Sequence, residues 1–343
     1  MKEISLHKSR ILIGEAVANV HAYLPSLRVV IITDSNVRKC YGALCDLFPV
    51  IEIEQGEPHK TLATIDYITS ELVRLEADRK TFILGVGGGI VCDVAGFAAS
   101  IFMRGLPFGF ISTTLLSQVD ASVGGKNGVN YKGYKNMLGV FAQPQFVICD
   151  PQSMATLPQK ELASGFAEVV KAAMIANASL FDYIEENAEK ILQKDPQTLE
   201  HLVYEAVKIK ADIVAVDERE QSERRKLNLG HTFAHAIEKN ATLTHGEAVS
   251  VGLCKAARLA VMLGMMSVSE QKRVENILQR LTLPTAVDIP SSTLCAAIRK
   301  DKKKMGDDIH LALPVGIGRC EIRKMALATL SYLMTVDKPA VLL

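Results

Sequence analysis

The chain has 343 residues, of which 48% are hydrophobic and 22% charged, with 39 Lys and Arg against 38 Asp and Glu. This composition is ordinary for a soluble globular protein and leaves room for two domains, while the balanced charge disfavours nucleic acid or a membrane as a partner. Seven cysteines without a C-x-x-C pair favour a reducing, cytoplasmic setting, and no targeting or membrane-spanning segment is expected.

The first part of the chain alternates short β-branched runs with amphipathic segments. Strands are predicted at 29–33, 50–53, 82–86, 108–112 and 146–149, with a helix at 62–76 between the second and third. Runs that are apolar on both faces and separated by helices are typical of a parallel sheet. The sequence therefore predicts an α/β domain, which we place at residues 1–157.

Glycines 87–89 follow the third predicted strand and open a helix, so backbone N–H groups there could hold a phosphate. The dinucleotide pattern G-x-G-x-x-G is not completed, because Ile90 replaces its last glycine. Steric packing at a strand end would explain the same glycines. Asp34, Glu57 and Lys60 follow the first two strands, where an open α/β sheet binds its ligand.

From residue 159 to 266 the pattern becomes helical, with Ala, Glu and Lys in periodic stretches. A strand pair is expected at 310–314 and 318–322, around Gly316. We therefore expect a second, mainly α-helical domain at residues 158–343.

Three of the eight histidines lie within fifteen residues, a pattern that indicates a metal site. His231 and His235 are four apart and would share one helix face, and His245 opens the next helix. Imidazole suits Zn²⁺, and a catalytic zinc typically has three protein ligands. Spacing alone favours His231 and His235 as the ligand pair, while solvated or core histidines remain the alternative. The segment is not H-E-x-x-H, so it does not indicate a metalloprotease.

Nearly the whole chain shares a series of short segments with one known protein family. The resemblance is carried by nine segments in order: GEPHK, GGGIVCDVAGFAASIFMRG, STTLLSQVDASVGGKNGVN, KNMLGVF, TLPQKELASGFAEVVK, DERE, RKLNLGHTFAHAIE, HGEAVSVG and DKKK. In these segments the chain resembles the 3-dehydroquinate synthase family. The resemblance implies a Rossmann-like NAD-binding domain, a helical metal-binding domain and a cleft between them for a sugar phosphate.

The resemblance also implies a metal site different from the one that spacing favours. The ligands would be Glu168, His231 and His245, with His235 facing the substrate. A helical Glu168 beside Lys171 could instead form a surface pair. The metal would be Zn²⁺, with Co²⁺ or another divalent cation as alternatives.

For NAD, the resemblance implies glycines and threonines at the pyrophosphate and carboxylates at the ribose hydroxyls. The matching positions are Asp34, Glu57, Lys60, Gly88, Gly89, Asp93, Thr113, Thr114, Lys135, Thr156, Leu157 and Glu161.

The substrate implied is 3-deoxy-D-arabino-heptulosonate 7-phosphate, which carries two anionic groups. The resemblance places Arg104, Lys126, Asn136, Lys302 and His235 around the phosphate, Lys210, Arg224 and Asn228 around the carboxylate and ring oxygens, and Asp120 and Lys171 at ring hydroxyls. Among these, catalytic roles are expected for His235, Lys171, Asp120 and Asn228. The assignment of Lys302 within the run of lysines 302–304 is open.

The implied reaction uses NAD catalytically, through transient oxidation, loss of phosphate, reduction, ring opening and aldol closure. A homodimer is also implied, with Arg104 reaching the partner's site. The alternative role for Arg104 is a favourable interaction of its charge with a helix C-terminus. Competing interpretations are a cyclase acting on neutral sugar phosphates, a glycerol-dehydrogenase-like metal oxidoreductase and a non-catalytic binding protein.

Overall fold

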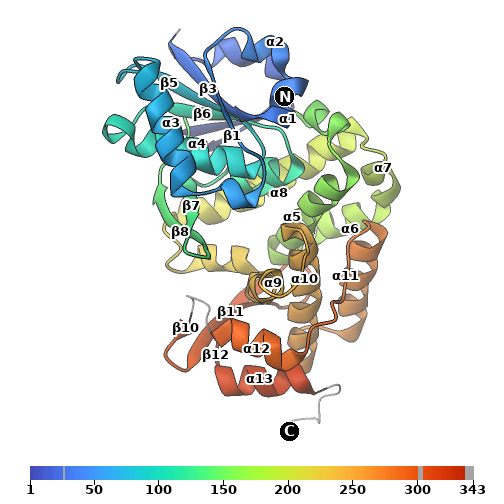
Figure 1. The fold of residues 1–343 in the computed structure, drawn as a ribbon. Helices are drawn as coiled ribbons and strands as arrows, with labels where there is room; N and C mark the ends of the chain where they lie inside the picture. The colour runs from blue at the N-terminus through green and yellow to red at the C-terminus, as the bar shows by residue number, and fades with distance from the viewer. Residues whose placement is uncertain (26–27, 300–303, 337–343) are drawn as a thin grey trace. The chain divides into compact units, whose positions relative to one another are not determined.

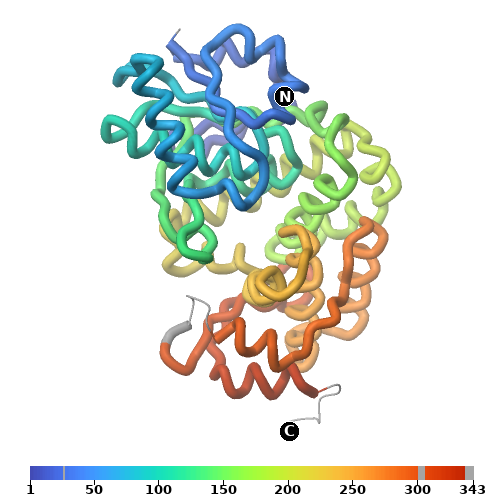
Figure 2. The backbone as a smooth tube through the Cα atoms, in the orientation of Figure 1, coloured from blue at the N-terminus to red at the C-terminus, as the bar shows by residue number. Residues whose placement is uncertain are grey.

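The computed structural model describes residues 1–25, 28–299 and 304–336. It contains two compact units, one made of Met1–Pro158 with Leu199–Ala215 and the other of Gln159–Thr198 with Val216–Leu343. Figure 2 traces the order of the chain through them by colour. The domain boundary after residue 157 remains a prediction.

The first unit is built on a seven-stranded sheet (Figure 1), with strand order β1-β2-β9-β6-β5-β3-β4. Only the β1–β2 pair is antiparallel, and the other neighbours run parallel. The strands are β1 (Lys2–Leu6), β2 (Ser9–Ile13), β3 (Val29–Asp34), β4 (Val50–Ile53), β5 (Phe82–Gly87), β6 (Phe108–Ser112) and β9 (Phe146–Cys149).

The central strands are buried along their whole length, as their continuous apolar runs predict. Phe82 and Phe146 stack with ring centroids 5.7 Å apart inside the core. β3 and β5 are neighbours in the sheet. The strand that follows β3 in sequence, β4, lies on the far side of β3, whereas the strand that follows β5, β6, lies on the far side of β5. The carboxyl ends of β3 and β5 therefore form the switch point at which open α/β sheets bind ligands.

Helices α3 (Leu62–Arg74) and α4 (Gly89–Ile101) contact each other and pack on strands of this sheet. An antiparallel ribbon of β7 (Lys126–Tyr131) and β8 (Tyr134–Phe141) also contacts α4. The remaining elements of this unit are η1 (Val17–Ala22), α1 (Ser35–Cys40), α2 (Gly42–Cys45), η2 (Glu57–His59), η3 (Phe102–Arg104), η4 (Ser117–Ala121), η5 (Pro151–Thr156) and most of α8 (Pro196–Val216).

The second unit is mainly helical, as predicted. Its central helix α10 (His245–Met262) packs against both α5 (Gln159–Ala176) and α9 (His231–Glu238). The other elements are α6 (Ala178–Glu186), α7 (Ala188–Leu192), η6 (Glu223–Asn228), α11 (Val268–Arg280), α12 (Ser291–Arg299), α13 (Leu327–Thr335) and the sheet of β10 (Lys304–Met305), β11 (Asp308–Pro314) and β12 (Cys320–Ala326).

The sheet topology and the helical second unit confirm the predicted fold class. The expected strand pair is β11–β12, although β12 begins two residues later and runs longer than predicted. Among the described residues, no helix has the length and apolar character needed to span a membrane.

Candidate metal centre and active site

Three helices of the second unit bring Glu168, His231 and His245 together, within 4.8 Å of one another by their nearest ligand atoms. Glu168 Oε1 lies 3.5 Å from His231 Nε2 and 3.3 Å from His245 Nε2. The Glu168 side chain is 1% exposed, so this carboxylate requires charged or polar partners. One carboxylate oxygen and two imidazole nitrogens are a donor set that suits Zn²⁺ or Co²⁺.

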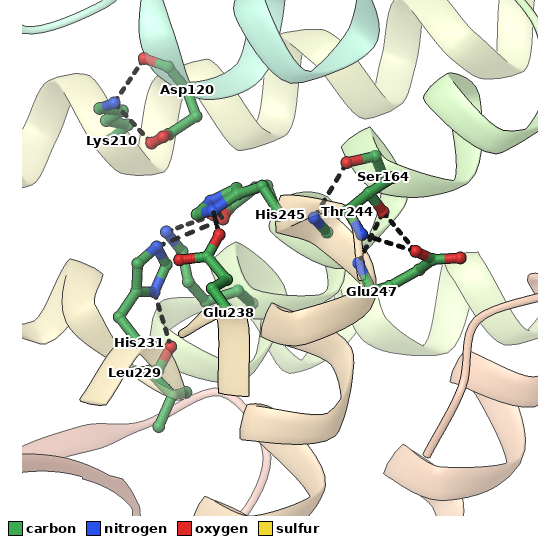
Figure 3. A network of polar contacts seen from close by, with 12 residues as sticks. Asp120, Ser164, Lys210, Leu229, His231, Glu238, Thr244, His245 and Glu247 are labelled. Atoms are coloured by element: carbon green, nitrogen blue, oxygen red, sulfur yellow. Dashed lines mark hydrogen bonds and ion pairs between the residues drawn. The ribbon is translucent and has the colours of Figure 1, made fainter. Parts of the chain in front are cut away.

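Close backbone packing between helices brings these side chains together. An added Cβ on Gly246 would overlap the Cα and carbonyl oxygen of Ser164, so only glycine allows α10 to approach α5 this closely. The N–H of Gly246 donates to Ser164 Oγ at 3.0 Å. Ser164 is labelled in Figure 3. Because Gly246 follows His245 and Ser164 lies one helical turn before Glu168, this contact sets the distance between the Glu168 and His245 side chains.

The start of α10 is fixed by a capping box. Thr244 Oγ1 accepts from the N–H of Glu247, and the Glu247 carboxylate accepts from the N–H of Thr244 at 2.7 Å. His245 is therefore the first residue of a well-defined helix rather than part of a loose loop.

The pKa values of His231 and His245 are shifted in opposite directions by burial and by the charges around them. The Lys171 ammonium pairs with Glu168 Oε2 in a buried contact. Burial lowers the pKa of His231 well below its usual value, and the Lys171 charge lowers it further. Burial also disfavours the protonated form of His245, but hydrogen bonds to the Glu168 and Glu238 carboxylates outweigh it and raise its pKa to about 9.

The pair favoured by spacing, His231 and His235, is not the group that the structure brings together. The two rings lie edge to face with centroids 5.7 Å apart, but His235 is outside the three-residue cluster. The helical repeat correctly predicts a shared face, yet His245 approaches His231 from another helix, with centroids 5.5 Å apart.

Arg224 and Asn228 lie in η6, before α9, and hydrogen bonds hold both in fixed positions. The buried Arg224 donates from Nη1 to the carbonyl oxygen of Glu218, and its backbone N–H donates to Asp217 Oδ2 at 3.0 Å. Asn228 donates from Nδ2 to Glu220 Oε1. Sequence reasoning missed Glu220, although it lies in the DERE segment that carries part of the resemblance.

In the first unit, residues predicted for the cofactor and for the substrate form one polar cluster. The buried Lys60 contacts Asp93 and donates to Asn136 Oδ1 at 2.6 Å. Burial raises the pKa of Asp93, and the Lys60 ammonium opposes this rise without cancelling it. Glu57 accepts a hydrogen bond from Asn130 Nδ2 at 2.8 Å.

The glycine turn lies at the carboxyl end of β5. Gly88 is the N-cap residue of α4 and Gly89 its first residue, and an added Cβ on Gly88 would lie 3.1 Å from Thr114 Cγ2. Thr113 donates its N–H to Gly87 O at 3.0 Å. The turn and the two threonines therefore lie together, at the helix N-terminus where a phosphate would be stabilised.

Asp34 ends β3 and caps α1, with Oδ1 accepting from the N–H groups of Asn36 and Val37 at 2.9 and 3.0 Å. Its carboxylate therefore has a structural role besides any contact to ribose.

Asp120 pairs with Lys210 of α8, which donates from Nζ to Asp120 Oδ1 at 2.6 Å (Figure 3). Lys210 is buried, so the pair fixes the position of the Asp120 carboxylate. Both residues were predicted to contact substrate.

The other predicted residues lie at the surface or outside the described part of the chain. Arg104 is exposed in the turn after α4, with a left-handed φ of 69°, rather than in the helix itself. Lys302 lies outside the described residues. The exposed or half-buried remainder are Lys126 and Lys135 of the β7–β8 ribbon, Thr156 and Leu157 at the end of η5, and Glu161 in the first turn of α5.

Two family models match consecutive parts of the chain. The 3-dehydroquinate synthase N-terminal model matches residues 50–164, and the 3-dehydroquinate synthase C-terminal model matches residues 165–304. The 3-dehydroquinate synthase of Pseudoalteromonas translucida (strain TAC 125) is 40% identical over 311 residues, which cover 88% of this chain and 87% of that protein.

Solved structures with the same fold include ValA, a 2-epi-5-epi-valiolone synthase from Streptomyces hygroscopicus subsp. jinggangensis 5008 with NAD⁺ and Zn²⁺ bound. It superposes with a TM-score of 0.87 at 27% identity, covering 97% of each chain. A 2-deoxy-scyllo-inosose synthase complexed with carbaglucose-6-phosphate, NAD⁺ and Co²⁺ superposes with a TM-score of 0.86 at 24% identity, covering 97% of this chain and 99% of that one.

Proposed function

The chain belongs to the 3-dehydroquinate synthase family, and we propose that it converts 3-deoxy-D-arabino-heptulosonate 7-phosphate to 3-dehydroquinate and phosphate. This is a carbon–oxygen lyase reaction of the shikimate pathway, which leads to the aromatic amino acids. The observation that carries the proposal is 40% identity to a 3-dehydroquinate synthase over most of both chains. The cluster of Glu168, His231 and His245 supports it independently, because it supplies a donor set for a divalent cation.

When bound, NAD accepts and returns a hydride, and a divalent metal ion polarises oxygen atoms of the substrate as a Lewis acid. We propose that Glu168, His231 and His245 hold this ion. His235 lies beside His231 and is assigned to moving a proton near the phosphate. Lys171 is buried against Glu168, and we assign it to a ring hydroxyl.

The substrate's two anionic ends require cations held in fixed positions. We assign Arg224, Lys210 and Asn228 to the carboxylate and ring oxygens, because buried contacts fix the first two and a hydrogen bond to Glu220 fixes the third. Asp120 is assigned to a ring hydroxyl. Lys126, Asn136, Lys302 and Arg104 are assigned to the phosphate.

For NAD, we propose that the pyrophosphate lies at the helix N-terminus opened by Gly88 and Gly89, beside Thr113 and Thr114. Asp34, Glu57, Lys60 and Asp93 would contact the ribose and nicotinamide parts, together with Lys135, Thr156, Leu157 and Glu161. The location of the glycine turn beside the sheet's switch point supports this assignment.

We also propose a cytoplasmic homodimer in which Arg104 reaches the partner's site. Exposed Ile101 and Met103 precede Arg104, and exposed Met137 and Phe141 lie on β8, which contacts α4. Neighbouring exposed apolar side chains are typical of protein–protein contacts. An isologous dimer would make the donation of Arg104 reciprocal.

The competing function is that of a cyclase for neutral sugar phosphates, and Arg224 distinguishes it from the proposed one. We expect rapid turnover of the heptulosonate phosphate and little turnover of glucose 6-phosphate or a neutral heptulose phosphate. Arg224→Lys should lower kcat/KM for the acidic substrate about 30-fold, equivalent to about 2 kcal/mol, because lysine cannot form two parallel hydrogen bonds with a carboxylate.

The matched control is Arg225→Lys, the same change at the next, half-buried position, which should alter kcat/KM little. An analogue without the carboxylate should be nearly indifferent to Arg224→Lys. Equal turnover of acidic and neutral phosphates by the unaltered enzyme would refute the proposed substrate.

A further inference from the structure

The two histidines of the metal cluster each use one ring nitrogen for the cluster and the other for a different acceptor. Nε2 of both rings faces Glu168. Nδ1 of His231 lies 3.2 Å from the carbonyl oxygen of Leu229, and Nδ1 of His245 lies 3.1 Å from Glu238 Oε1. A neutral imidazole has one N–H, so an acceptor at Nδ1 places the proton there and leaves the Nε2 lone pair directed at the cluster.

The two acceptors differ in chemistry. Leu229 offers a neutral carbonyl oxygen of the main chain, whereas Glu238 offers a charged side chain that is only 7% exposed. Glu238 is the last residue of α9, the helix that begins with His231. Figure 3 shows its carboxylate directed at His245 of the neighbouring helix. Leu229, which lies just before α9, and the last residue of α9 thus provide the acceptors for the two imidazoles.

Helix stability does not explain a glutamate at this position. The C-terminal end of a helix is the negative end of its dipole, and a carboxylate there is disfavoured. Burial adds a desolvation cost to this unfavourable interaction. The contact between Glu238 and His245 supplies a gain that offsets these costs.

The charge balance of the cluster also favours a carboxylate at position 238. The Glu168 carboxylate is neutralised by the ammonium of Lys171. Metal binding requires both imidazoles to be neutral, and in that state Glu238 is the carboxylate that gives the group of Glu168, Lys171, His231, His245 and Glu238 a net negative charge. A divalent cation beside a lysine ammonium gains from that charge.

We propose that Glu238 is a positioning residue for the metal ion. It holds His245 in the tautomer and orientation that direct Nε2 to the ion, and it increases the affinity through its charge. Glu238 is not a member of the ligand cluster and acts through His245. This inference rests on the proposed metal site and adds a residue that neither spacing nor family resemblance indicated.

The test measures metal affinity without using turnover. Metal-stripped full-length protein is titrated with Co²⁺ in competition with a chelator, and the visible absorption of the bound ion reports both affinity and coordination. Glu238→Gln retains size but removes the charge, and Glu238→Ala removes the acceptor as well. We expect Kd for Co²⁺ to rise about 10- to 100-fold in both variants, with an altered cobalt spectrum.

Glu247→Gln is the matched control. Glu247 is also a partly buried carboxylate beside His245, but it bonds to the N–H and Oγ1 of Thr244 in the capping box. We expect this variant to leave Kd within about threefold, because a glutamine at this position can still accept from the N–H of Thr244 and the change does not touch the imidazole.

The outcomes separate this inference from the proposed function. Unaltered protein that binds one Co²⁺, with Glu238 variants that bind equally well, overturns the role of Glu238 and leaves the metal site intact. Weakening by Glu247→Gln as large as that by Glu238→Gln also overturns it, since the effect would then come from the helix start. Unaltered protein that binds no Co²⁺ overturns the metal site itself. A far-ultraviolet circular dichroism spectrum checks that each variant is folded. If Glu238→Ala does not fold, the test rests on Glu238→Gln.

Discussion

At the residue scale, Asp217 organises the segment that carries Arg224. Its carboxylate accepts from the N–H groups of Gln221 at 2.9 Å, Ser222 at 2.7 Å and Arg224 at 3.0 Å. Burial alone would raise the pKa of Asp217, but these backbone donors outweigh it and lower the pKa below its ordinary value of 3.8. The ionised carboxylate therefore stabilises the folded protein.

We therefore expect Asp217→Asn to destabilise the protein in a pH-dependent way. Because the folded-state pKa lies below the unfolded-state value, the stabilisation is present above the unfolded pKa and is lost as pH falls through the folded pKa. Asp217→Asn should lower the free energy of unfolding by about 1–3 kcal/mol at neutral pH. The difference should persist unchanged to pH 5 and shrink only below about pH 4.

Urea unfolding across this range measures the difference between variant and unaltered protein. Asp212→Asn, at an exposed position of α8, is the control and should change stability little. A difference that already disappears between pH 7 and pH 5 would contradict the assigned role of the Asp217 carboxylate.

At the element scale, glycines allow α10 to lie close to both of its neighbours. Gly246 faces Ser164 of α5, and Gly252 faces the carbonyl oxygen of Gly230, the N-cap residue of α9. Gly230 itself has a left-handed φ of 77°, which favours glycine. The approach of three helices at these points brings the metal-cluster residues together.

We therefore expect Gly246→Ala to affect both stability and metal affinity. The new methyl group cannot fit against the Ser164 backbone, so α10 must move away from α5 and carry His245 with it. Overpacking of this kind typically costs about 1–3 kcal/mol. Thermal unfolding of the metal-free protein and Co²⁺ titration would measure the two effects.

Gly42→Ala is the matched control, because an added Cβ at Gly42 in α2 would meet no atom within 4 Å. It should be neutral or slightly stabilising. Retention of normal metal affinity by Gly246→Ala would show that the helix contact does not set the ligand geometry.

The burial of individual strands and helices explains which of them could be predicted from the sequence. The central strands were predicted to within one residue of their ends because their apolar runs are buried on both faces. The β1–β2 hairpin and the β7–β8 ribbon were not predicted; the ribbon strand β8 is mostly exposed and lacks such a run. Helical periodicity in α8 does not reveal which unit the helix packs with.

For the metal cluster, spacing within one helix favoured His235, whereas the structure groups His231 with His245. The difference arises from contacts between helices, which have no fixed spacing in sequence. Family resemblance supplied Glu168 and His245, but Glu238 emerged only from the hydrogen bond to Nδ1.

At the scale of the whole molecule, the proposed dimer depends on Arg104. This residue is exposed on a left-handed backbone, and exposed Ile101 and Met103 precede it. The proposed role of Arg104 is to reach the phosphate in the partner subunit's site.

Mixing two inactive variants tests this arrangement. In a heterodimer of Arg104→Ala and His235→Ala subunits, one site would contain both changes and the other neither. Activity should therefore return toward one intact site per heterodimer after subunit exchange. Heterodimers that form but stay inactive, or an active monomer, would contradict the donation of Arg104.

The central claim is that the protein is a cyclase using NAD without net oxidation. The most direct measurement follows phosphate release and NADH absorbance together, with the heptulosonate phosphate in large excess over NAD⁺ and with Zn²⁺ or Co²⁺ present. We expect phosphate release equal to the substrate consumed, a carbocyclic product and no net accumulation of NADH. Consumption of substrate limited by NAD⁺, with one NADH formed per turnover, would contradict it and indicate a metal-dependent dehydrogenase.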